Sequence, residues 1–186
     1  MIKVAITGKI GSGKTTVSEI ISNLGYKVFE ADKIVKNLFL DQKVIHSIRE
    51  KFESKIPNLL LKNQFINKVL LSDFVFSNKK ELENLENILH PNIKKEQETF
   101  ENLNINEKVL FFDIPLLFEK KLHLNYDLII YLKVSRPLQK ARVLKRKDMT
   151  IKKLKDILSI QTHKYSDIKK FIAIELNMKE DLKSIK

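Results

Sequence analysis

The chain has no cysteine and no tryptophan, and it contains only four glycines and four prolines among 186 residues. Without cysteine, disulfides, thiolate catalysis and cysteine-based metal sites are excluded. No apolar run approaches the roughly 20 residues that a membrane-spanning helix needs. The first apolar residues run directly into a motif, so they are interpreted as part of the fold rather than as an export signal. These absences predict a cytoplasmic protein with no membrane partner.

Negative charge is also in the minority, which leaves a formal net charge of +12 at pH 7. Such a charge either attracts a polyanion or reflects lysines spread over solvated helix faces. The lysines are scattered and there is no tryptophan to stack on bases, so no nucleic-acid partner is predicted. The four arginines behave differently, because three of them, Arg136, Arg142 and Arg146, lie within eleven residues. This clustering indicates a need for fork-shaped, permanently charged donors.

Three of the four glycines, Gly8, Gly11 and Gly13, fall within six residues. They follow the alternating, β-branched segment 2–7, which is typical of a strand. Apolar residues at helical spacing begin after Lys14 and end at Gly25, a suitable helix C-cap. A short second strand is predicted at 27–29. Strand, glycine loop, helix and strand form the start of a βαβ unit, which predicts a parallel α/β sheet.

The remaining pattern predicts one domain with a helical insertion. Residues 33–104 show helical spacing throughout, and the strands resume at 108–112 and 128–132, whose continuous apolar runs indicate central strands. Helices are predicted at 138–147 and 151–160, and a last strand at 171–174. The fold class is therefore α/β, with a central parallel sheet and a helical insertion.

The glycine segment fits the phosphate-binding pattern G-x-x-x-x-G-K-[ST] at every defined position, reading Gly8-Lys9-Ile10-Gly11-Ser12-Gly13-Lys14-Thr15. Glycines let successive backbone N–H groups point inward at phosphate oxygens, and the following helix adds the positive end of its dipole. Lys14 reaches the β- and γ-phosphates, and the Thr15 hydroxyl can ligate Mg²⁺. The predicted ligands are therefore ATP and Mg²⁺. The residues predicted to contact ATP here are Gly8, Ile10, Gly11, Ser12, Gly13, Lys14, Thr15 and Thr16.

Two acids follow predicted strands and so share the sheet edge with the phosphate loop. Asp32 could accept the proton of an attacking hydroxyl and help to hold Mg²⁺, or it could cap the next helix. Asp113 ends a buried strand, a position from which P-loop proteins orient Mg²⁺, although capping the strand end is the alternative.

Basic and imidazole side chains complete the candidates. Arg142 and Arg146 lie four residues apart on a predicted helix and so face one side, from which they could spread the charge of a transferring phosphoryl group; a solvated face is the alternative. The other histidines lack metal-ligand spacing, and His90, before Pro91, is predicted to end a long helix.

Taken together, these residues resemble the dephospho-CoA kinase family over residues 1 to about 165. The resemblance is carried by an ordered set of motifs rather than by the loop alone. The set comprises Gly8 to Thr15, Glu30-Ala31-Asp32, Val75-Phe76, Leu85-Glu86, His90-Pro91-Asn92-Ile93, Asp113-Ile114-Pro115-Leu116-Leu117-Phe118-Glu119, Asp127, Gln139, Arg142, Arg146 and Gln161.

This resemblance implies a three-layer P-loop kinase fold with a central parallel sheet, a helical substrate-binding insertion and a helical lid. The implied boundaries are core 1–32, 105–138 and 166–186, acceptor-binding region 33–104 and lid 139–165. The implied reaction is transfer of the γ-phosphoryl group of ATP to the ribose 3′-hydroxyl of dephospho-CoA. The resemblance implies that Asp32 is the base and Arg142 the lid arginine, and that both act with Lys14 in catalysis. It also implies an acceptor site that includes Asp32, His90, Pro115, Leu116, Leu117 and Glu119. The sequence departs from the family at Asn67-Lys68, at Lys94, and at residues 171–177, where an adenine-side motif is nearly erased.

Three other functions are compatible with the sequence. A small P-loop kinase that acts on a nucleoside or a nucleoside monophosphate would have the same loop and lid. A nucleic-acid-stimulated P-loop ATPase would explain the positive charge, and a nucleotide-sensing module without catalysis would explain the eroded end. The expected partners are the small molecules ATP and dephospho-CoA, and the expected assembly is a monomer or a weak homo-oligomer.

Overall fold

The computed structural model describes residues 1–147 and 149–178. The chain divides into two units: a sheet unit, Met1–Ala31 with the chain from Glu101 onward, and a helical unit, Asp32–Phe100. Residue 148 of the predicted lid and residues 179–186 of the predicted core lie outside the described residues. No helix in the described ranges is both long enough and apolar enough to cross a membrane.

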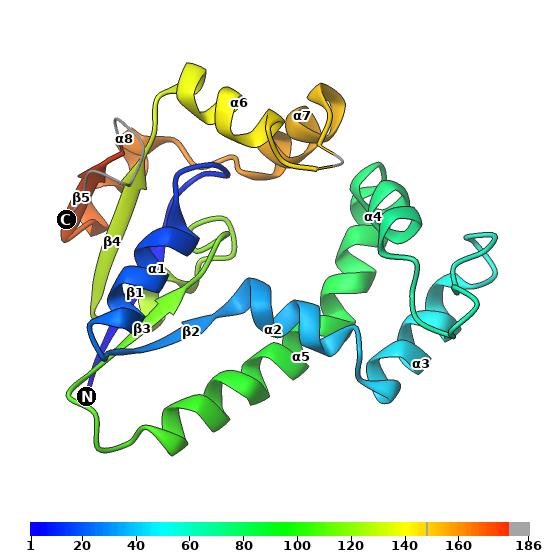
Figure 1. Ribbon diagram of the computed structural model, residues 1–186, viewed down its shortest axis with the longest axis horizontal. Coiled ribbons are helices and arrows are strands. Elements are labelled where there is room, and N and C mark those ends of the chain that lie inside the picture. Colours follow the sequence, from blue (N-terminus) through cyan, green and yellow to red (C-terminus); the bar gives the residue numbers. More distant parts are fainter. Residues whose placement is uncertain (148, 179–186) are drawn as a thin grey trace. The chain divides into compact units, whose positions relative to one another are not determined.

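The sheet unit is built on five parallel strands in the order β2-β3-β1-β4-β5, with β1 at the centre (Figure 1). The strands are β1 Ile2–Thr7, β2 Lys27–Glu30, β3 Val109–Asp113, β4 Leu128–Lys133 and β5 Ile174–Asn177. Ala5 and Ile6 of β1 and Leu110 of β3 have no exposed surface, as continuous apolar strands covered on both faces require. The predicted parallel α/β sheet is confirmed.

The last strand begins three residues later than the pattern predicts, which corrects the expected strand at 171–174. Phe171 ends a short 3₁₀ helix, η2 Lys169–Phe171, and its ring packs 4.6 Å from that of His123. Its apolar character therefore serves packing against another segment and not strand pairing. β5 starts only at Ile174, which pairs with Ile130 of β4.

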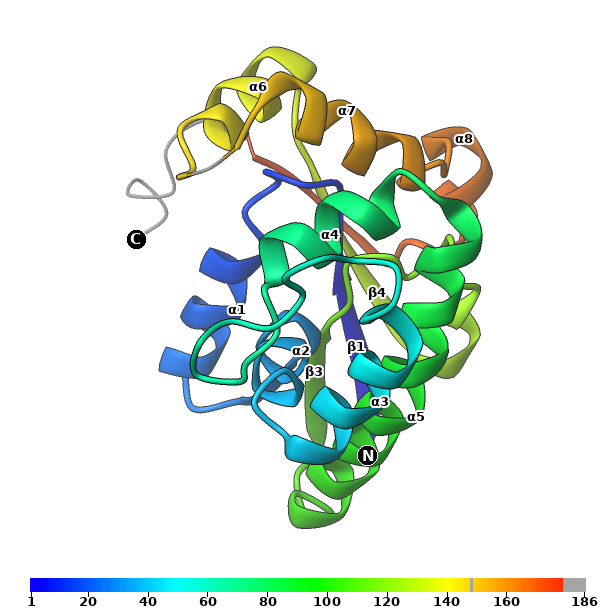
Figure 2. The same ribbon diagram turned by 90° about the vertical axis from the view of Figure 1, so that its right-hand side faces the viewer.

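Helices of the sheet unit lie along and beyond the strands. They are α1 Lys14–Asn23, η1 Leu122–Asn125, α6 Arg136–Leu144, α7 Ile151–Ile160 and α8 Tyr165–Ile168. Val17 and Ile21 of α1 pack against Ile6 and Leu132, which fixes α1 on one face of the sheet. In both ribbon views α6 and α7 lie side by side beyond the strand ends, next to the loop between β1 and α1 (Figures 1 and 2).

The helical unit consists of α2 Ala31–Leu38, α3 Gln42–Phe52, α4 Lys68–Phe76 and most of α5 Lys79–Leu103. Asp41 caps α3 by accepting a hydrogen bond from the Lys43 N–H at 2.7 Å, and Asn67 caps α4 through the Leu70 N–H. Their apolar faces enclose one cluster of buried side chains. Its members include Ile48, Phe52, Leu59, Leu71 and Val75.

Helix α5 does not end at His90, contrary to the sequence-based expectation, but continues through Pro91 to Leu103. Proline removes a backbone donor from the helix interior and normally kinks or ends it. The side-chain amide of Asn92 donates to the Ile88 carbonyl at 2.8 Å and so adds a hydrogen bond in the turn that contains the proline. Leu85 and Leu89 of the preceding turns are buried in the cluster, and this packing favours a continuous helix.

Candidate functional site

The loop between β1 and α1 is closed by contacts that only glycine permits. A Cβ on Gly8 would lie 2.5 Å from the Leu132 carbonyl oxygen, so the loop touches the backbone of β4. The Ser12 N–H donates to the Lys9 carbonyl at 3.1 Å and tightens the turn. Helix α1 then begins without a side-chain cap and without an acidic residue in its first turn. Its first N–H groups and positive dipole end are left for an anion, as in phosphate-binding loops.

Lys14, the first residue of α1, folds back over this loop. Its Nζ donates to the Gly8 carbonyl at 3.0 Å, which places the ammonium group on the loop itself. Thr15 is exposed and Thr16 half-buried, whereas Ser12 is fully buried, and its Oγ has no hydrogen-bond partner among the described residues. The structure therefore brings Lys14 and the glycines together as the sequence predicts.

Asp113 lies at the carboxyl edge of the sheet against α1. In the strand registers it is opposite Ile6 of β1 and Glu30 of β2, and its Oδ2 accepts from the Ser18 hydroxyl at 3.5 Å. The side chain is buried. Within residues 1–147 and 149–178 no group of three or more acidic or histidine side chains could hold a metal by itself. A site with only two protein ligands, such as the Asp113 carboxylate and the Thr15 hydroxyl, suits Mg²⁺, because this ion keeps several waters and substrate oxygens as its other ligands.

Asp32 and His90 belong to the helical unit. Helix α2 begins at Ala31, so Asp32 lies within the first turn and not at the N-cap position. Its side chain is exposed, and so is that of His90 on α5. Both are accessible to a ligand, and in sequence Asp32 follows the last residue of β2 by two positions.

Arg142 and Arg146 do not share one helix, which corrects the predicted helix at 138–147. Helix α6 ends at Leu144, and the Arg146 N–H bonds to the Val143 carbonyl in an i→i−3 turn. Arg142 is therefore half-buried on the helix, whereas Arg146 is exposed beyond its end. Arg142 is the better-held donor of the pair.

Much of the loop that follows β3 is buried. Leu117 is fully buried, while Pro115 and Leu116 are half-buried. The Glu119 carboxylate is nearly buried and contacts the His163 Nδ1 at 2.5 Å. Burial opposes ionisation of Glu119, but hydrogen bonds from His163 and from the Glu119 backbone outweigh it and lower its pKa below the ordinary 4.5.

Tyr131 of β4 extends this pair into a chain of three polar groups. Its hydroxyl lies 3.1 Å from the His163 Nε2. Burial, helped by the Glu119 and Glu175 carboxylates, raises the pKa of Tyr131 to about 12. Because the phenol keeps its proton, Tyr131 can donate to Nε2, and His163 can then donate from Nδ1 to Glu119. The chain ties the loop after β3 to the segment after α7.

Sequence reasoning did not identify this chain of contacts or two glutamines near the phosphate loop. Glu119 and His163 are 44 residues apart, and no local pattern connects them. Gln139 and Gln161 appear in the family motifs, but no local pattern indicates that both bind Ile10. The one signal in the sequence is that these two uncharged glutamines stand within or next to segments rich in lysine and arginine.

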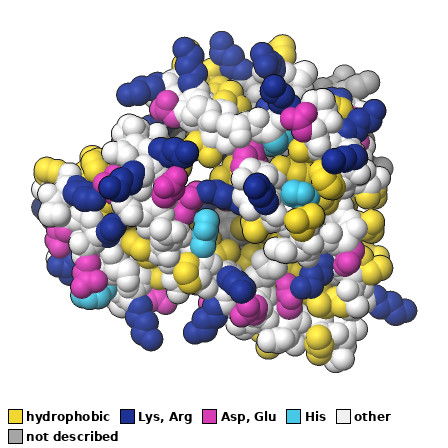
Figure 3. All heavy atoms as spheres, turned by 180° about the vertical axis from the view of Figure 1, so that it is seen from behind, with side chains coloured by type: hydrophobic (Ala, Val, Ile, Leu, Met, Phe, Trp, Pro, Cys, Tyr) yellow, Lys and Arg dark blue, Asp and Glu magenta, His cyan; other side chains and the backbone are white. Residues whose placement is uncertain are grey.

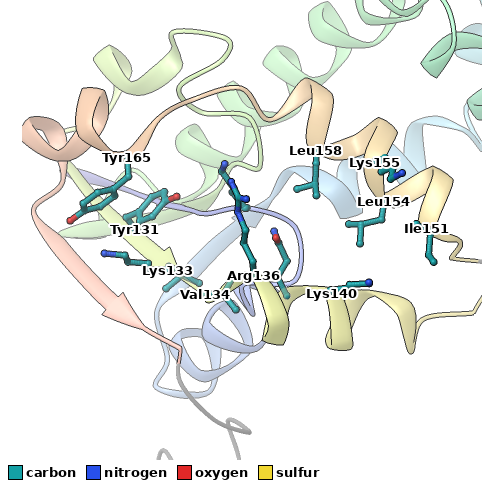
Figure 4. Close-up of a pocket in the computed structure, with 13 residues that line it drawn as sticks. Tyr131, Lys133, Val134, Arg136, Lys140, Ile151, Leu154, Lys155, Leu158 and Tyr165 are labelled. Atoms are coloured by element: carbon teal, nitrogen blue, oxygen red, sulfur yellow. The ribbon is translucent and has the colours of Figure 1, made fainter.

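A cavity of about 640 Å³ lies beside the loop within the sheet unit, at the end of β4 and between α6 and α7. Figure 4 shows Tyr131 and Tyr165 at one end, Ile151 and Lys155 at the other and Arg136 between them. Among the described residues its lining includes five basic side chains and no carboxylate: Lys9, Lys133, Arg136, Lys140 and Lys155. Clustered positive charge beside the loop raises the local concentration of anions such as polyphosphates.

Several known proteins are similar to this chain in sequence and in architecture. The profile of the family described as dephospho-CoA kinase matches residues 2–174. A dephospho-CoA kinase of Buchnera aphidicola is 35% identical over 183 residues, covering 98% of this chain and 85% of its own length. One from Fusobacterium nucleatum is also 35% identical, covering 96% and 92%. The solved dephospho-CoA kinase of Campylobacter jejuni superimposes with a TM-score of 0.65 at 30% identity, covering 97% and 90%.

Proposed function

The chain belongs to the dephospho-CoA kinase family, and we propose that it transfers the γ-phosphoryl group of ATP to the ribose 3′-hydroxyl of dephospho-CoA. The observation that carries this proposal is the glycine loop between β1 and α1, with an uncapped helix N-terminus and Lys14 folded over it. Phosphoryl transfer depends mainly on positioning and charge neutralisation, which are what such a loop supplies.

On the donor side, the phosphates of ATP occupy the loop. Lys14 exchanges its bond to the Gly8 carbonyl for phosphate oxygens, and the free N–H groups of the first turn of α1 bind the same charge. Thr15 and Asp113 would hold Mg²⁺, which neutralises charge on the β- and γ-phosphates when it is bound. Asp113 is already held against α1 by Ser18, so this ligand is pre-positioned.

On the acceptor side, Asp32 accepts the proton of the 3′-hydroxyl as that oxygen attacks. Its exposure at the start of α2 allows a substrate to reach it. In the sheet unit, Pro115 and Leu116 keep part of their surface exposed and are the candidate acceptor contacts. In the helical unit, the exposed His90 is the candidate contact. Leu117 and Glu119 stabilise the loop after β3, because their side chains are buried in the interior.

The α6–α7 segment acts as the lid. Arg142, half-buried on α6, spreads the charge that develops on the transferring phosphoryl group, and Arg146 adds a contact from its exposed position beyond the helix end. A closed lid excludes water, which would otherwise take the phosphoryl group. The proposed partners are ATP and dephospho-CoA, and the cytoplasmic location and the monomeric or weakly oligomeric state stay predictions.

The experiment is mass-spectrometric detection of coenzyme A after incubation of the chain with dephospho-CoA and Mg-ATP. Lys14→Ala serves as the negative control, and a panel of nucleosides and nucleoside monophosphates replaces the acceptor in parallel reactions. We expect a product that is one phosphoryl group heavier only with dephospho-CoA. Faster transfer to any member of the panel would assign the chain to another acceptor.

The alternative of an ATPase stimulated by nucleic acid is tested by a second measurement. Basic side chains in Figure 3 are most frequent along its upper edge, and elsewhere they are interspersed with acidic ones. ATP hydrolysis stimulated by single-stranded nucleic acid, without transfer to dephospho-CoA, would contradict the proposal.

A further inference from the structure

Ile10, in the middle of the phosphate loop, has both of its backbone polar groups bound by side chains from the lid. Its N–H donates to the Gln161 Oε1 at 2.9 Å, and its carbonyl accepts from the Gln139 Nε2 at 2.8 Å. Gln139 lies on α6 and Gln161 directly follows α7. Both glutamines are buried, with 6% and 5% of their surface exposed. One loop residue is thus held from both ends of the helical hairpin.

The two glutamines are not equivalent, because a backbone N–H can only donate and a carbonyl can only accept. Gln161 must present its oxygen to Ile10, and Gln139 must present its nitrogen. The orientation of each amide is therefore fixed by its partner. Since the Ile10 N–H is bound to Gln161, other N–H groups of the loop and of α1 receive the phosphates.

Close packing strengthens the same connection. Gly11 has φ +78°, and a Cβ at this position would lie 2.7 Å from the Val143 Cγ2 and 3.2 Å from the Gln139 carbonyl oxygen. Helix α6 therefore rests directly on the loop backbone, one turn from Gln139. Arg142 precedes Val143 on this helix, so its distance from the loop depends on how α6 is seated.

We propose that Gln139 and Gln161 are positioning residues that hold the phosphate loop and α6 in register, so that Lys14 and Arg142 act on the same phosphoryl group. This inference rests on the proposed kinase function. Charge stabilisation depends steeply on geometry, since a misplacement of about 1 Å can cost roughly 100-fold in rate. Loss of either hydrogen bond lets the loop and the helix shift relative to each other and lowers kcat.

Two isosteric substitutions test the polarity of the contacts. Gln139→Glu and Gln161→Glu each place one carboxylate next to Ile10, so repulsion of the phosphates is similar in both. Glu at 161 still accepts from the Ile10 N–H, whereas Glu at 139 cannot donate to the Ile10 carbonyl. We expect kcat of Gln139→Glu to be at least about 10-fold below that of Gln161→Glu. Dissociation constants for ATP should agree within about twofold, because both variants carry the same added charge.

Val4→Ala is the control for general loss of stability in the sheet unit, because Val4 is buried in β1 and lies in neither the loop nor the lid. Its kcat, measured well below its unfolding temperature, should equal that of the wild type. Equal kcat values for the two Glu variants would overturn the proposal. So would a loss of kcat in Val4→Ala as large as that in Gln139→Glu.

Hydrogen exchange at the Ile10 amide provides a readout that is independent of turnover. Exchange should be slow in the wild type and in Gln161→Glu, and at least about 10-fold faster in Gln161→Ala, because only that variant removes the acceptor. Equal exchange in all three would show that the contact does not hold the loop. A wild-type chain that shows slow exchange but makes no coenzyme A would contradict the proposed function instead.

Discussion

The interiors of the two units are built on different principles. Of the seven polar or charged residues that are buried within the described ranges, six belong to the sheet unit, and they include Ser12, Asp113, Gln139 and Gln161. The helical unit buries only Glu81 among them, which forms an ion pair with Lys55 at 2.7 Å. Otherwise its interior is an apolar cluster filled by side chains such as Ile48 and Phe52.

This difference separates two kinds of sensitivity. Apolar packing is non-directional and is governed by volume, so changes in the helical cluster should alter stability. Hydrogen bonds depend on donor, acceptor and angle, so changes of a single atom near the phosphate loop should alter chemistry with little loss of folding.

Lys14→Ala should have the largest effect on activity. Without the ammonium group the developing phosphate charge loses a donor, so turnover should fall by at least about 100-fold. The unfolding temperature should hardly change, because Lys14 is only half-buried at the loop surface. Lys9→Ala is the control, since Lys9 lies in the same loop at a position that the motif leaves undefined. Equal losses of turnover in the two variants would remove the special role of Lys14.

Asp32→Asn tests whether a residue of the helical unit takes part in the chemistry. Asparagine cannot accept a proton, so kcat should fall about 100-fold while the dissociation constant of ATP is unchanged. Asp41→Asn is the control in the same unit, because asparagine caps a helix as well as aspartate does. A normal kcat for Asp32→Asn would exclude the base and restrict catalysis to the sheet unit.

The parts of this site that the sequence predicts are local. Strand, loop and helix follow one another without interruption from Ile2 to Asn23, so alternation, glycine spacing and helical periodicity suffice to place the loop. Helix α7 has the predicted bounds, 151–160, because Thr150 caps its start by accepting from the Lys153 N–H. Interactions between residues close in sequence therefore determine both the segment from Ile2 to Asn23 and helix α7.

The parts that the sequence does not predict depend on distant contacts. Gln161 meets Ile10 across 151 residues, and neither position has a local feature that indicates its partner. Pro91 predicts a helix end by its own chemistry, but packing of the neighbouring leucines overrides it. The end of α6 is decided by a single i→i−3 hydrogen bond from Arg146, which periodicity does not resolve.

Ile48→Ala should show the opposite behaviour to Lys14→Ala. Ile48 has no exposed surface, and its truncation leaves a cavity that should cost about 2–5 kcal/mol in the free energy of unfolding. Ile48→Val, with one methyl group fewer, should cost about 0.5–1.5 kcal/mol. Urea denaturation measures both changes, and kcat below the transition should equal that of the wild type. A fall in kcat in proportion to the lost stability would contradict the division between volume and chemistry.

Glu119→Gln should give the smallest effect, visible only in the pH dependence of stability. The pKa of Glu119 is lower in the folded chain than its ordinary 4.5, so its ionised form stabilises the fold. That contribution is complete above pH 4.5 and is lost as the pH falls through the folded pKa. The stability of the wild type should therefore fall more steeply below pH 4.5 than that of Glu119→Gln, and the difference between them should shrink. The free energy of unfolding is measured by urea titration at a series of pH values. If its curves against pH stay parallel for the two proteins down to pH 3, ionisation of Glu119 beside His163 does not contribute to stability. The polar interior of the sheet unit would then be sustained by hydrogen-bond geometry alone.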